Sequence, residues 1–324
     1  MTVVVLGIDA LDIGLVRPDQ HHGLTLEHHS SIETIDSSAG EPSTHELWPT
    51  ILTGLRPEEH GLTLDDGVAW EHPVLAVGSR VADRVMPQRL QTRIGAWLLN
   101  NTGQDAFRVP ASYYGDRDIS TVFDGREAKA IGVPNYVTED DEEDREHRLR
   151  RRMGALFERD VEAKGGHRSD DPVAFYERCM EMSMVRIARV RRALRSREYE
   201  LVFGYTSGLD LIGHVSYDLP ALQERAYDEL DDFVGELWDD LAEDDELVLV
   251  SDHGLQDGVH THEAMMSSTS EELVDAIGSV LDVRSAIDGL LEARDHQPEK
   301  PDYSGDGDGE RGEVKDRLED LGYM

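Results

Sequence analysis

The stretch that decides the fold begins with Glu200-Leu-Val-Phe-Gly-Tyr205 and ends with Glu246-Leu-Val-Leu-Val-Ser251. Both runs are short, apolar and rich in β-branched or aromatic residues, which indicates buried strands. Between them, residues 220–241 place apolar side chains at helical spacing, namely Leu222, Ala226, Leu230, Phe233, Leu237 and Leu241. Strand, helix and strand of these lengths form a βαβ unit, which predicts parallel pairing of the two strands and a right-handed crossover.

The rest of the chain extends this alternation. Residues 2–8 form an uninterrupted apolar run, typical of a buried central strand. Residues 13–42 are polar and histidine-rich and predict a loop with an edge hairpin. Helices are expected at 47–55, at 88–101 and from Pro172 to about Arg197, and residues 128–137 predict a strand that leads into a Pro-containing loop. The predicted fold class is therefore α/β, with a mostly parallel central sheet flanked by helices.

Charge restricts the class of partner. The 324 residues include 68 acidic and 32 basic side chains, for a net charge of −36. The acidic residues are spread over the whole length, so the surface is expected to be a carboxylate shell that repels itself unless counter-ions screen it. Such a surface repels nucleic-acid phosphates, so a nucleic-acid duplex is not an expected partner. The distribution fits a halophilic protein from a high-salt cytoplasm.

The cysteine content and the length of the apolar runs indicate the cellular location of the protein. Cys179 is the only cysteine, which excludes an intrachain disulfide and a thiolate metal site. Met1-Thr2 leads directly into an apolar strand without a basic segment, so no secretory signal is expected. No apolar run approaches ~20 residues, so no membrane span is expected. These features predict a cytoplasmic location and no membrane partner.

Acidic groups end three of the predicted strands. Asp9 ends the first, the second continues to Asp210 and His214, and the third ends in Asp252-His253. In an open α/β sheet, ligands bind beyond the carboxyl ends of the strands. Asp and neutral His suit zinc or a similar divalent ion, and the spacing Asp-x-x-x-His can direct both groups to one side of a turn.

The number of candidate ligands indicates two ions. His260 and His262 follow shortly after the third strand, and either could supply a further imidazole. Six protein ligands are too many for one tetrahedral ion and suit two. Paired ions about 4 Å apart can clamp the attacking and the leaving oxygen of an in-line displacement. The expected cofactors are thus two divalent metal ions, Zn²⁺ with Mn²⁺ as the alternative.

Two hydroxyl groups are candidates for a nucleophile. Ser43-x-x-Glu46 has the spacing of a capping box, which places Ser43 and Thr44 at a helix N-terminus. The free N–H groups and the dipole of that terminus favour a phosphate. From the spacing alone, each hydroxyl could be a nucleophile or a helix cap.

The segment Thr53-Gly54-Leu-Arg-Pro57-Glu-Glu-His60-Gly61 resembles a motif of the alkaline phosphatase superfamily, specifically of its type I phosphodiesterase/nucleotide pyrophosphatase group. In that group the nucleophilic Thr or Ser lies ten residues before the first Gly of this motif. The first Gly here is Gly54, so the corresponding nucleophile is Thr44. The resemblance extends to Gly7-Ile-Asp9, to Asp210-Leu-Ile-Gly-His214 and to Ser251-Asp252-His253-Gly254. It implies an alkaline phosphatase-like three-layer sandwich with a mostly parallel central sheet.

The resemblance also implies a division of the ligands. One ion would be held by four residues: Asp9, Thr44, Asp252 and His253. The other would be held by Asp210, His214 and a downstream histidine, which we assign to His260 with His262 as the alternative. Ser43 would then be the helix cap, and His60-Gly61 a structural turn.

The implied activity is metal-dependent hydrolysis of a small phosphate ester. We expect a phosphodiesterase that forms a phosphothreonine at Thr44. His45-Glu46-Leu47 stands where nucleotide pyrophosphatases have Phe-Pro-Asn, so their substrate specificity is not implied. Two alternatives stay open: a phosphomonoesterase or phosphomutase with the same core, and a catalytically silent metal-binding interaction protein.

The expected organisation is one catalytic domain over residues 1–295. Within it, residues 62–198 separate the nucleophile from the second metal-ligand group, and this insert could act as a lid that selects substrate. Residues 296–311 are rich in Pro, Gly and Asp and predict a flexible acidic linker. Residues 312–324 predict a short C-terminal helix.

Overall fold

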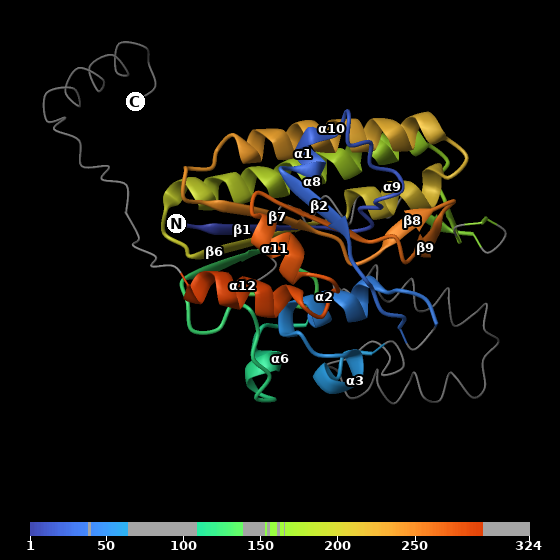
Figure 1. Ribbon diagram of the computed structural model, residues 1–324. Helices are drawn as coiled ribbons and strands as arrows, with labels where there is room; N and C mark the ends of the chain where they lie inside the picture. Colours follow the sequence, from blue (N-terminus) through green and yellow to red (C-terminus); the bar gives the residue numbers. More distant parts are fainter. Residues whose placement is uncertain are drawn as a thin grey trace, which may run out of the picture.

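The computed structural model describes residues 1–37, 40–63, 109–138, 153, 156–160, 163–164 and 166–293. In this part of the chain, a central sheet lies between two layers of helices (Figure 1). The α/β class with a mostly parallel, flanked sheet, predicted from the sequence, is confirmed. The predicted helix at 88–101, the linker at 296–311 and the C-terminal helix at 312–324 lie outside the described residues, as does much of the 62–198 insert.

The main sheet has six strands in the order β2-β10-β7-β1-β6-β3. Their bounds are β1 Val3–Ile8, β2 His28–Ser31, β3 Ala128–Ile131, β6 Leu201–Thr206, β7 Glu246–Val250 and β10 Met265–Ser268. β1 pairs in parallel with β6 and with β7, and β3 pairs in parallel with β6. β10 pairs antiparallel with both of its neighbours, β2 and β7. The carboxyl ends of β1, β6 and β7 therefore lie at one edge.

The βαβ prediction needs one correction. β6 and β7 are parallel, but they do not pair with each other, because β1 lies between them in register with both. The crossover helix α10, Pro220–Trp238, therefore spans an intervening strand. β1 is apolar on both faces and is completely buried, so it fits the middle of the sheet better than an edge position.

Alternate residues of β1 serve two separate cores. Val4, Leu6 and Ile8 pack in the core beneath the first helical layer, whereas Val3 and Val5 pack in the second core. The first layer contains α1 His22–Thr25, α8 Pro172–Ser196, α9 Gly208–Ser216 and α10. The second contains α2 Thr44–Thr53, α11 Glu271–Ala276 and α12 Val283–Glu292 (Figure 1). The remaining described elements are α3 Pro57–His60, α6 Ser112–Gly115, β4 Glu158–Arg159, β5 His167–Arg168, β8 Gly254–Gln256 and β9 Val259–Thr261.

Several predicted boundaries shift. The helix expected at 47–55 begins at Thr44 and ends at Thr53, where Gly54 adopts a left-handed conformation with φ 67°. The strand expected from residue 128 ends at Ile131, where Gly132 has a positive φ and turns the chain into the loop expected within 128–137. The edge hairpin expected within 13–42 is wrong: the segment holds helix α1 and a single strand, β2, whose partner is the distant β10.

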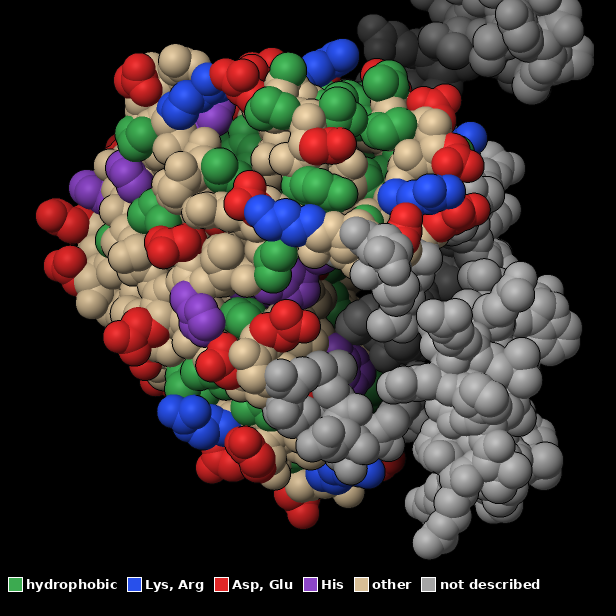
Figure 2. Space-filling view, turned by 90° about the vertical axis from the view of Figure 1, so that its right-hand side faces the viewer, with side chains coloured by type: hydrophobic (Ala, Val, Ile, Leu, Met, Phe, Trp, Pro, Cys, Tyr) green, Lys and Arg blue, Asp and Glu red, His purple; other side chains and the backbone are tan. Residues whose placement is uncertain are grey.

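The excess of acidic groups is distributed over the surface. Figure 2 shows acidic side chains scattered across the described face, with basic ones among them. One arginine of α8 and the arginine at its C-cap pair with carboxylates: Arg191 with Glu236 and Asp240, and Arg197 with Asp245. These pairs neutralise part of the local charge. No helix among the described residues combines the length and apolar composition needed to cross a bilayer.

Candidate metal centre

The site residues predicted from the sequence gather at the carboxyl ends of β1, β6 and β7. Asp9 directly follows β1, and Asp252 and His253 follow β7. Asp210 and His214 lie on α9, which begins two residues after β6 ends. Thr44 is the first residue of α2, and His260 lies on β9, beyond the end of β7. Parallel strands thus bring together residues that are far apart in the sequence.

Asp9, Asp252 and His253 form the first cluster. Their ligand atoms lie within 4.8 Å of one another, and all three side chains are buried. Nε2 of His253 lies 3.2 Å from Oδ1 of Asp9 and 3.4 Å from Oδ2 of Asp252. The hydroxyl of Thr44 completes the group, at 3.2 Å from Oδ1 of Asp9 and 3.3 Å from Nε2 of His253. Four possible ligand atoms therefore surround one point.

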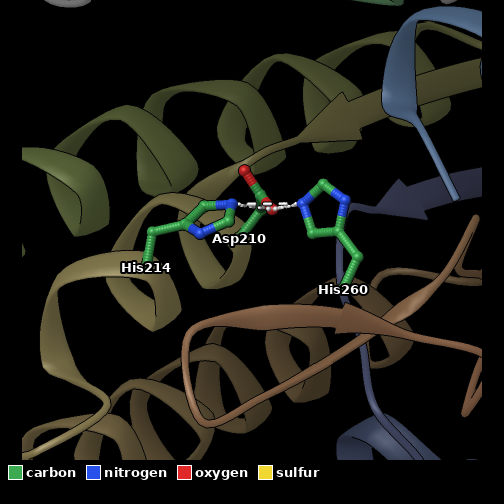
Figure 3. A group of neighbouring side chains, drawn as sticks. All are labelled: Asp210, His214 and His260. Atoms are coloured by element: carbon green, nitrogen blue, oxygen red, sulfur yellow. Dashed lines mark hydrogen bonds and ion pairs between the residues drawn. The ribbon is translucent and has the colours of Figure 1, made fainter. Parts of the chain in front are cut away.

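Asp210, His214 and His260 form the second cluster. The two imidazole rings approach the carboxylate of Asp210 from either side (Figure 3), and each Nε2 lies 3.3 Å from its Oδ1. The two Nε2 atoms are 3.1 Å apart. Asp210 and His214 are separated by one helical turn, which places both side chains on one face of α9.

His262 lies elsewhere. Its Nε2 is 2.7 Å from Oδ1 of Asp36, and both side chains are exposed. His262 lies just beyond β9, which ends at Thr261, so strand alternation does not fix its direction, and its side chain reaches Asp36 instead of the second cluster. The geometry therefore favours His260 over His262 for the second cluster.

The three histidines of the two clusters all direct the same ring nitrogen, Nε2, toward the carboxylates. Nδ1 of His253, His214 and His260 lies 3.0, 3.0 and 2.8 Å from the carbonyl oxygens of Gly254, Gly258 and Pro42, respectively. A carbonyl only accepts, so each Nδ1 must carry the proton. In the neutral form of such an imidazole the lone pair is on Nε2, the nitrogen that here faces the carboxylates. Histidines that bind metals are oriented in the same way.

The first cluster carries a strong negative potential. Burial, together with the nearby charge of Asp9, holds the pKa of Asp252 well above its usual range. Burial opposes the charged form of His253, but the carboxylates of Asp252 and Asp9 outweigh it and raise the pKa of His253 to about 10. Two buried carboxylates that repel each other and attract any positive charge favour the binding of a cation.

The second cluster lies directly beside the first. Burial would raise the pKa of Asp210, but His214 and His260 outweigh it and hold that pKa well below its usual range. The rings of His253 and His260 stack with their centroids 4.1 Å apart. One imidazole from each cluster thus forms the boundary between them.

The unsatisfied oxygens of Asp252 fit a metal ion. Neither carboxylate oxygen of Asp252 has a hydrogen-bond partner in the described part of the chain, although the side chain is completely buried. Leaving a buried carboxylate without partners is costly. Together with the inward-facing Nε2 atoms, these oxygens provide the O and N donors that Zn²⁺ and Mn²⁺ accept. The residues present therefore fit divalent metal ions.

The start of α2 differs from the capping-box prediction. Ser43 occupies the N-cap position, but its side chain makes no capping hydrogen bond. An asparagine from another segment holds this terminus instead. Nδ2 of Asn135 donates to the backbone oxygen of His45 at 2.9 Å and lies 3.0 Å from Nδ1 of the same residue. Asn135 thereby fixes the backbone next to Thr44.

Tyr205 is a site residue that the sequence analysis placed only at the end of a strand. Its hydroxyl donates to Oδ2 of Asp9 at 2.5 Å, from the neighbouring strand β6. The parallel register pairs Gly7 with Tyr205, so the tyrosine lies two positions before Asp9 along the sheet. Knowledge that β1 and β6 are neighbours would have revealed this contact, but neither strand shows it alone.

A family model described as type I phosphodiesterase/nucleotide pyrophosphatase matches residues 3–296. No curated protein is significantly similar in sequence.

Solved structures show only distant similarity. Murine ectonucleotide pyrophosphatase/phosphodiesterase 5 is 16% identical, with a TM-score of 0.40, and the match covers 78% of this chain and 57% of that one. A mutant of the TAB5 alkaline phosphatase with bound Mg is 10% identical, with a TM-score of 0.47 and coverage of 90% and 97%. Phosphonoacetate hydrolase from Sinorhizobium meliloti is 15% identical, with a TM-score of 0.37 and coverage of 78% and 56%. The chain therefore spans little more than half the length of two of these proteins.

Proposed function

Because the chain belongs to the type I phosphodiesterase/nucleotide pyrophosphatase family, we propose that it is a metal-dependent phosphodiesterase with Thr44 as its nucleophile. One observation carries the proposal most directly. The hydroxyl of Thr44 lies within 3.3 Å of both Asp9 and His253, at the first residue of a ten-residue helix. A hydroxyl at that place contacts candidate metal ligands and the positive end of a helix dipole at once.

The proposed ligands divide as the two clusters do. Asp9, Thr44, Asp252 and His253 would hold one ion. Asp210, His214 and His260 would hold the other. When bound, such ions lower the pKa of a nucleophilic hydroxyl and offset the charge on the leaving oxygen. Zn²⁺ is the proposed metal and Mn²⁺ the alternative, since both accept this set of O and N donors.

Thr44 would attack in line. Its Oγ1 forms a bond to phosphorus as the bond to the leaving oxygen breaks, and the hydroxyl proton passes to solvent or to a carboxylate of the first cluster. The N-terminus of α2 would hold a non-bridging oxygen of the phosphoryl group. Water would then attack the phosphorus from the side of Asp210 and His214, break its bond to Oγ1 of Thr44 and release a phosphate monoester, while the threonine regains a proton from solvent.

The charge around the site favours a diester substrate. In the described part of the chain, no Lys or Arg side chain hydrogen-bonds or forms an ion pair with any of the seven proposed ligands. A phosphate monoester carries about two negative charges at neutral pH, since its second pKa is near 6, and would need more neutralisation beside these carboxylates. A diester carries a single negative charge and suits the site better.

The decisive experiment combines metal content with activity. Wild-type protein should contain two divalent ions and hydrolyse bis(nitrophenyl) phosphate faster than nitrophenyl phosphate. Thr44→Ala should lower diesterase activity by at least about 1,000-fold, because removing a nucleophile has effects of this size or larger. Ser43→Ala is the matched control, and it should leave activity near wild type because that hydroxyl makes no capping bond.

Each of the other results would count against the proposal. Full activity in Thr44→Ala would exclude the phosphothreonine. A preference for the monoester would favour a phosphomonoesterase or phosphomutase. Bound metal without turnover of either ester would indicate a silent binding protein.

A further inference from the structure

Asp12 is a buried carboxylate that the proposed mechanism does not use. Its side chain is completely buried, three residues after Asp9. It forms no ion pair within the described residues, and its hydrogen-bond donors are all neutral. Fully buried acidic side chains are rare unless they are paired, so its position calls for an explanation.

The donors to Asp12 come mainly from one hairpin. Nε2 of Gln256, on β8, donates to Oδ1 at 3.0 Å, and the hydroxyl of Thr261, on β9, donates to Oδ2 at 3.2 Å. A single carboxylate thus holds both strands of the β8–β9 hairpin. His260 lies on this hairpin next to Thr261, and its backbone pairs with Leu255.

The backbone around Asp12 is fixed from the opposite side. The N–H of Asp12 donates to the hydroxyl of Tyr227 on α10 at 3.1 Å, and that hydroxyl donates to the carbonyl of Ala10. Asp9 belongs to the same short turn, since the N–H of Leu11 bonds back to Ile8. The turn therefore connects the first cluster rigidly to the carboxylate that holds the hairpin.

A glycine allows this close approach. A Cβ at Gly254 would lie 2.5 Å from Oδ2 of Asp12 and 2.5 Å from Oγ1 of Thr261. Both distances are far below an ordinary van der Waals contact, so a larger residue would push the carboxylate and the hairpin apart. Gly254 directly follows His253, so the contact is next in the chain to a residue of the first cluster.

We propose that Asp12 is a positioning residue that sets the place of His260 relative to Asp9, and so the second metal site relative to the first. This inference rests on the proposed two-metal function and goes beyond it, because Asp12 would touch neither metal nor substrate. The β8–β9 hairpin is a separate two-stranded sheet without ladder bonds to the main one. Its attachment through Asp12 therefore helps to determine where the imidazole of His260 lies, together with the bonds of the hairpin to Pro42 and His214.

The test measures Mn²⁺ binding by calorimetric titration and the metal pair by electron paramagnetic resonance. Asp12→Ala should weaken the second Mn²⁺ by 10–100-fold, the usual cost of losing a group that orients a ligand, and should leave the first close to wild type. The spin-coupled signal of the Mn²⁺ pair should change as well. In a His260→Ala background, Asp12→Ala should add little further loss, because both changes act on one ligand.

Two further variants make the test decisive. Gln256→Met combined with Thr261→Val removes the hairpin side of the contact and retains Asp12, so it replaces Asp12→Ala if that variant does not fold. Asp231→Ala is the matched control: this carboxylate also accepts a backbone N–H, that of Leu24, but it lies on α10. The control should bind both ions normally.

The outcomes separate this inference from the proposed function. Wild-type Mn²⁺ affinities and an unchanged spin-coupled signal in both Asp12→Ala and the double variant Gln256→Met with Thr261→Val would overturn the role of Asp12. The proposed function would then stay intact. A wild-type protein that binds fewer than two ions would overturn both.

Discussion

The hydroxyl of Tyr205 lies 2.5 Å from Oδ2 of Asp9, and this bond joins two adjacent parallel strands at the point where the first cluster begins. The donor restrains the rotation of the carboxylate. Oδ1, the other oxygen, faces His253 at 3.2 Å. Tyr205 thus orients Asp9 toward its proposed metal.

Tyr205→Phe should therefore weaken metal binding at the first site by about 10–100-fold, as expected when a group that orients a ligand is lost. The ring should stay in place, because its edge-to-face packing on Trp48, with centroids 4.9 Å apart, does not need the hydroxyl. Calorimetric titration with Mn²⁺ measures the effect. Tyr176→Phe, at a buried tyrosine on α8, is the control. Equal affinities in the two variants would show that the bond to Asp9 has no such role.

The two candidate histidines of the second site can be separated directly. His260→Ala should weaken binding of one of the two ions by at least about 100-fold, because it removes a proposed ligand rather than a group behind one. His262→Ala should change that affinity by less than about threefold, since it breaks only an exposed ion pair with Asp36. Metal content after dialysis, measured for both proteins, checks the prediction. The reverse pattern would assign the ligand to His262.

Protonation of His60 should destabilise the fold in acid. Its side chain is completely buried, and the N–H of Leu62 donates to its Nδ1. A proton on Nδ1 would break that hydrogen bond and face the N–H group of Leu62. Burial lowers the pKa of His60 to about 4. Because the unfolded value is near 6.5, the stabilising contribution is complete above pH 6.5 and is lost as the pH falls toward 4, by roughly 3 kcal/mol.

Urea unfolding between pH 7 and pH 4 measures this loss. His60→Gln cannot titrate, so its free energy of unfolding should fall less steeply over the same range, even if it starts lower. Parallel curves for the two proteins would assign the acid sensitivity to other groups.

Gly7 marks the tightest packing of β1 on α2. A Cβ at this position would lie 2.4 Å from Cη2 of Trp48, whose side chain is completely buried. Gly7→Ala should therefore lower the free energy of unfolding by roughly 1–3 kcal/mol, the usual cost of overpacking a core. Gly235→Ala is the opposite case, because nothing lies within 4 Å of its Cβ in helix α10. That variant should gain about 0.5–1 kcal/mol. Denaturant unfolding of both proteins tests the pair. If Gly7→Ala lowered the free energy of unfolding no more than Gly235→Ala, the side chain of Trp48 would be able to move aside without cost.

The sequence predicts what local patterns encode. Apolar runs located β1, β6 and β7, and motif spacing singled out Thr44 and the acidic strand ends. The order of the strands in the main sheet could not be predicted from such local patterns. The βαβ pattern made β6 and β7 neighbours, whereas β1 lies between them, because an uninterrupted apolar strand is buried most completely at the centre.

Contacts between distant segments explain the rest of what the sequence missed. Tyr205 and Asp12 are unremarkable in their own segments, and their roles depend on which strand or hairpin packs beside them. The contact of Asn135 with His45 is of the same kind, since Asn135 arrives from beyond β3 to bond at the start of α2. Local propensity carries no information about such partners.

The location of the seven proposed ligands has a consequence for biosynthesis. Asp9 and Thr44 leave the ribosome early, whereas Asp252, His253 and His260 emerge only after most of the chain has been made. Each cluster includes at least one of these late residues. A nascent chain therefore has neither cluster until β7 has been inserted beside β1. An incomplete or truncated product would carry the early carboxylate and hydroxyl without the groups that complete either cluster.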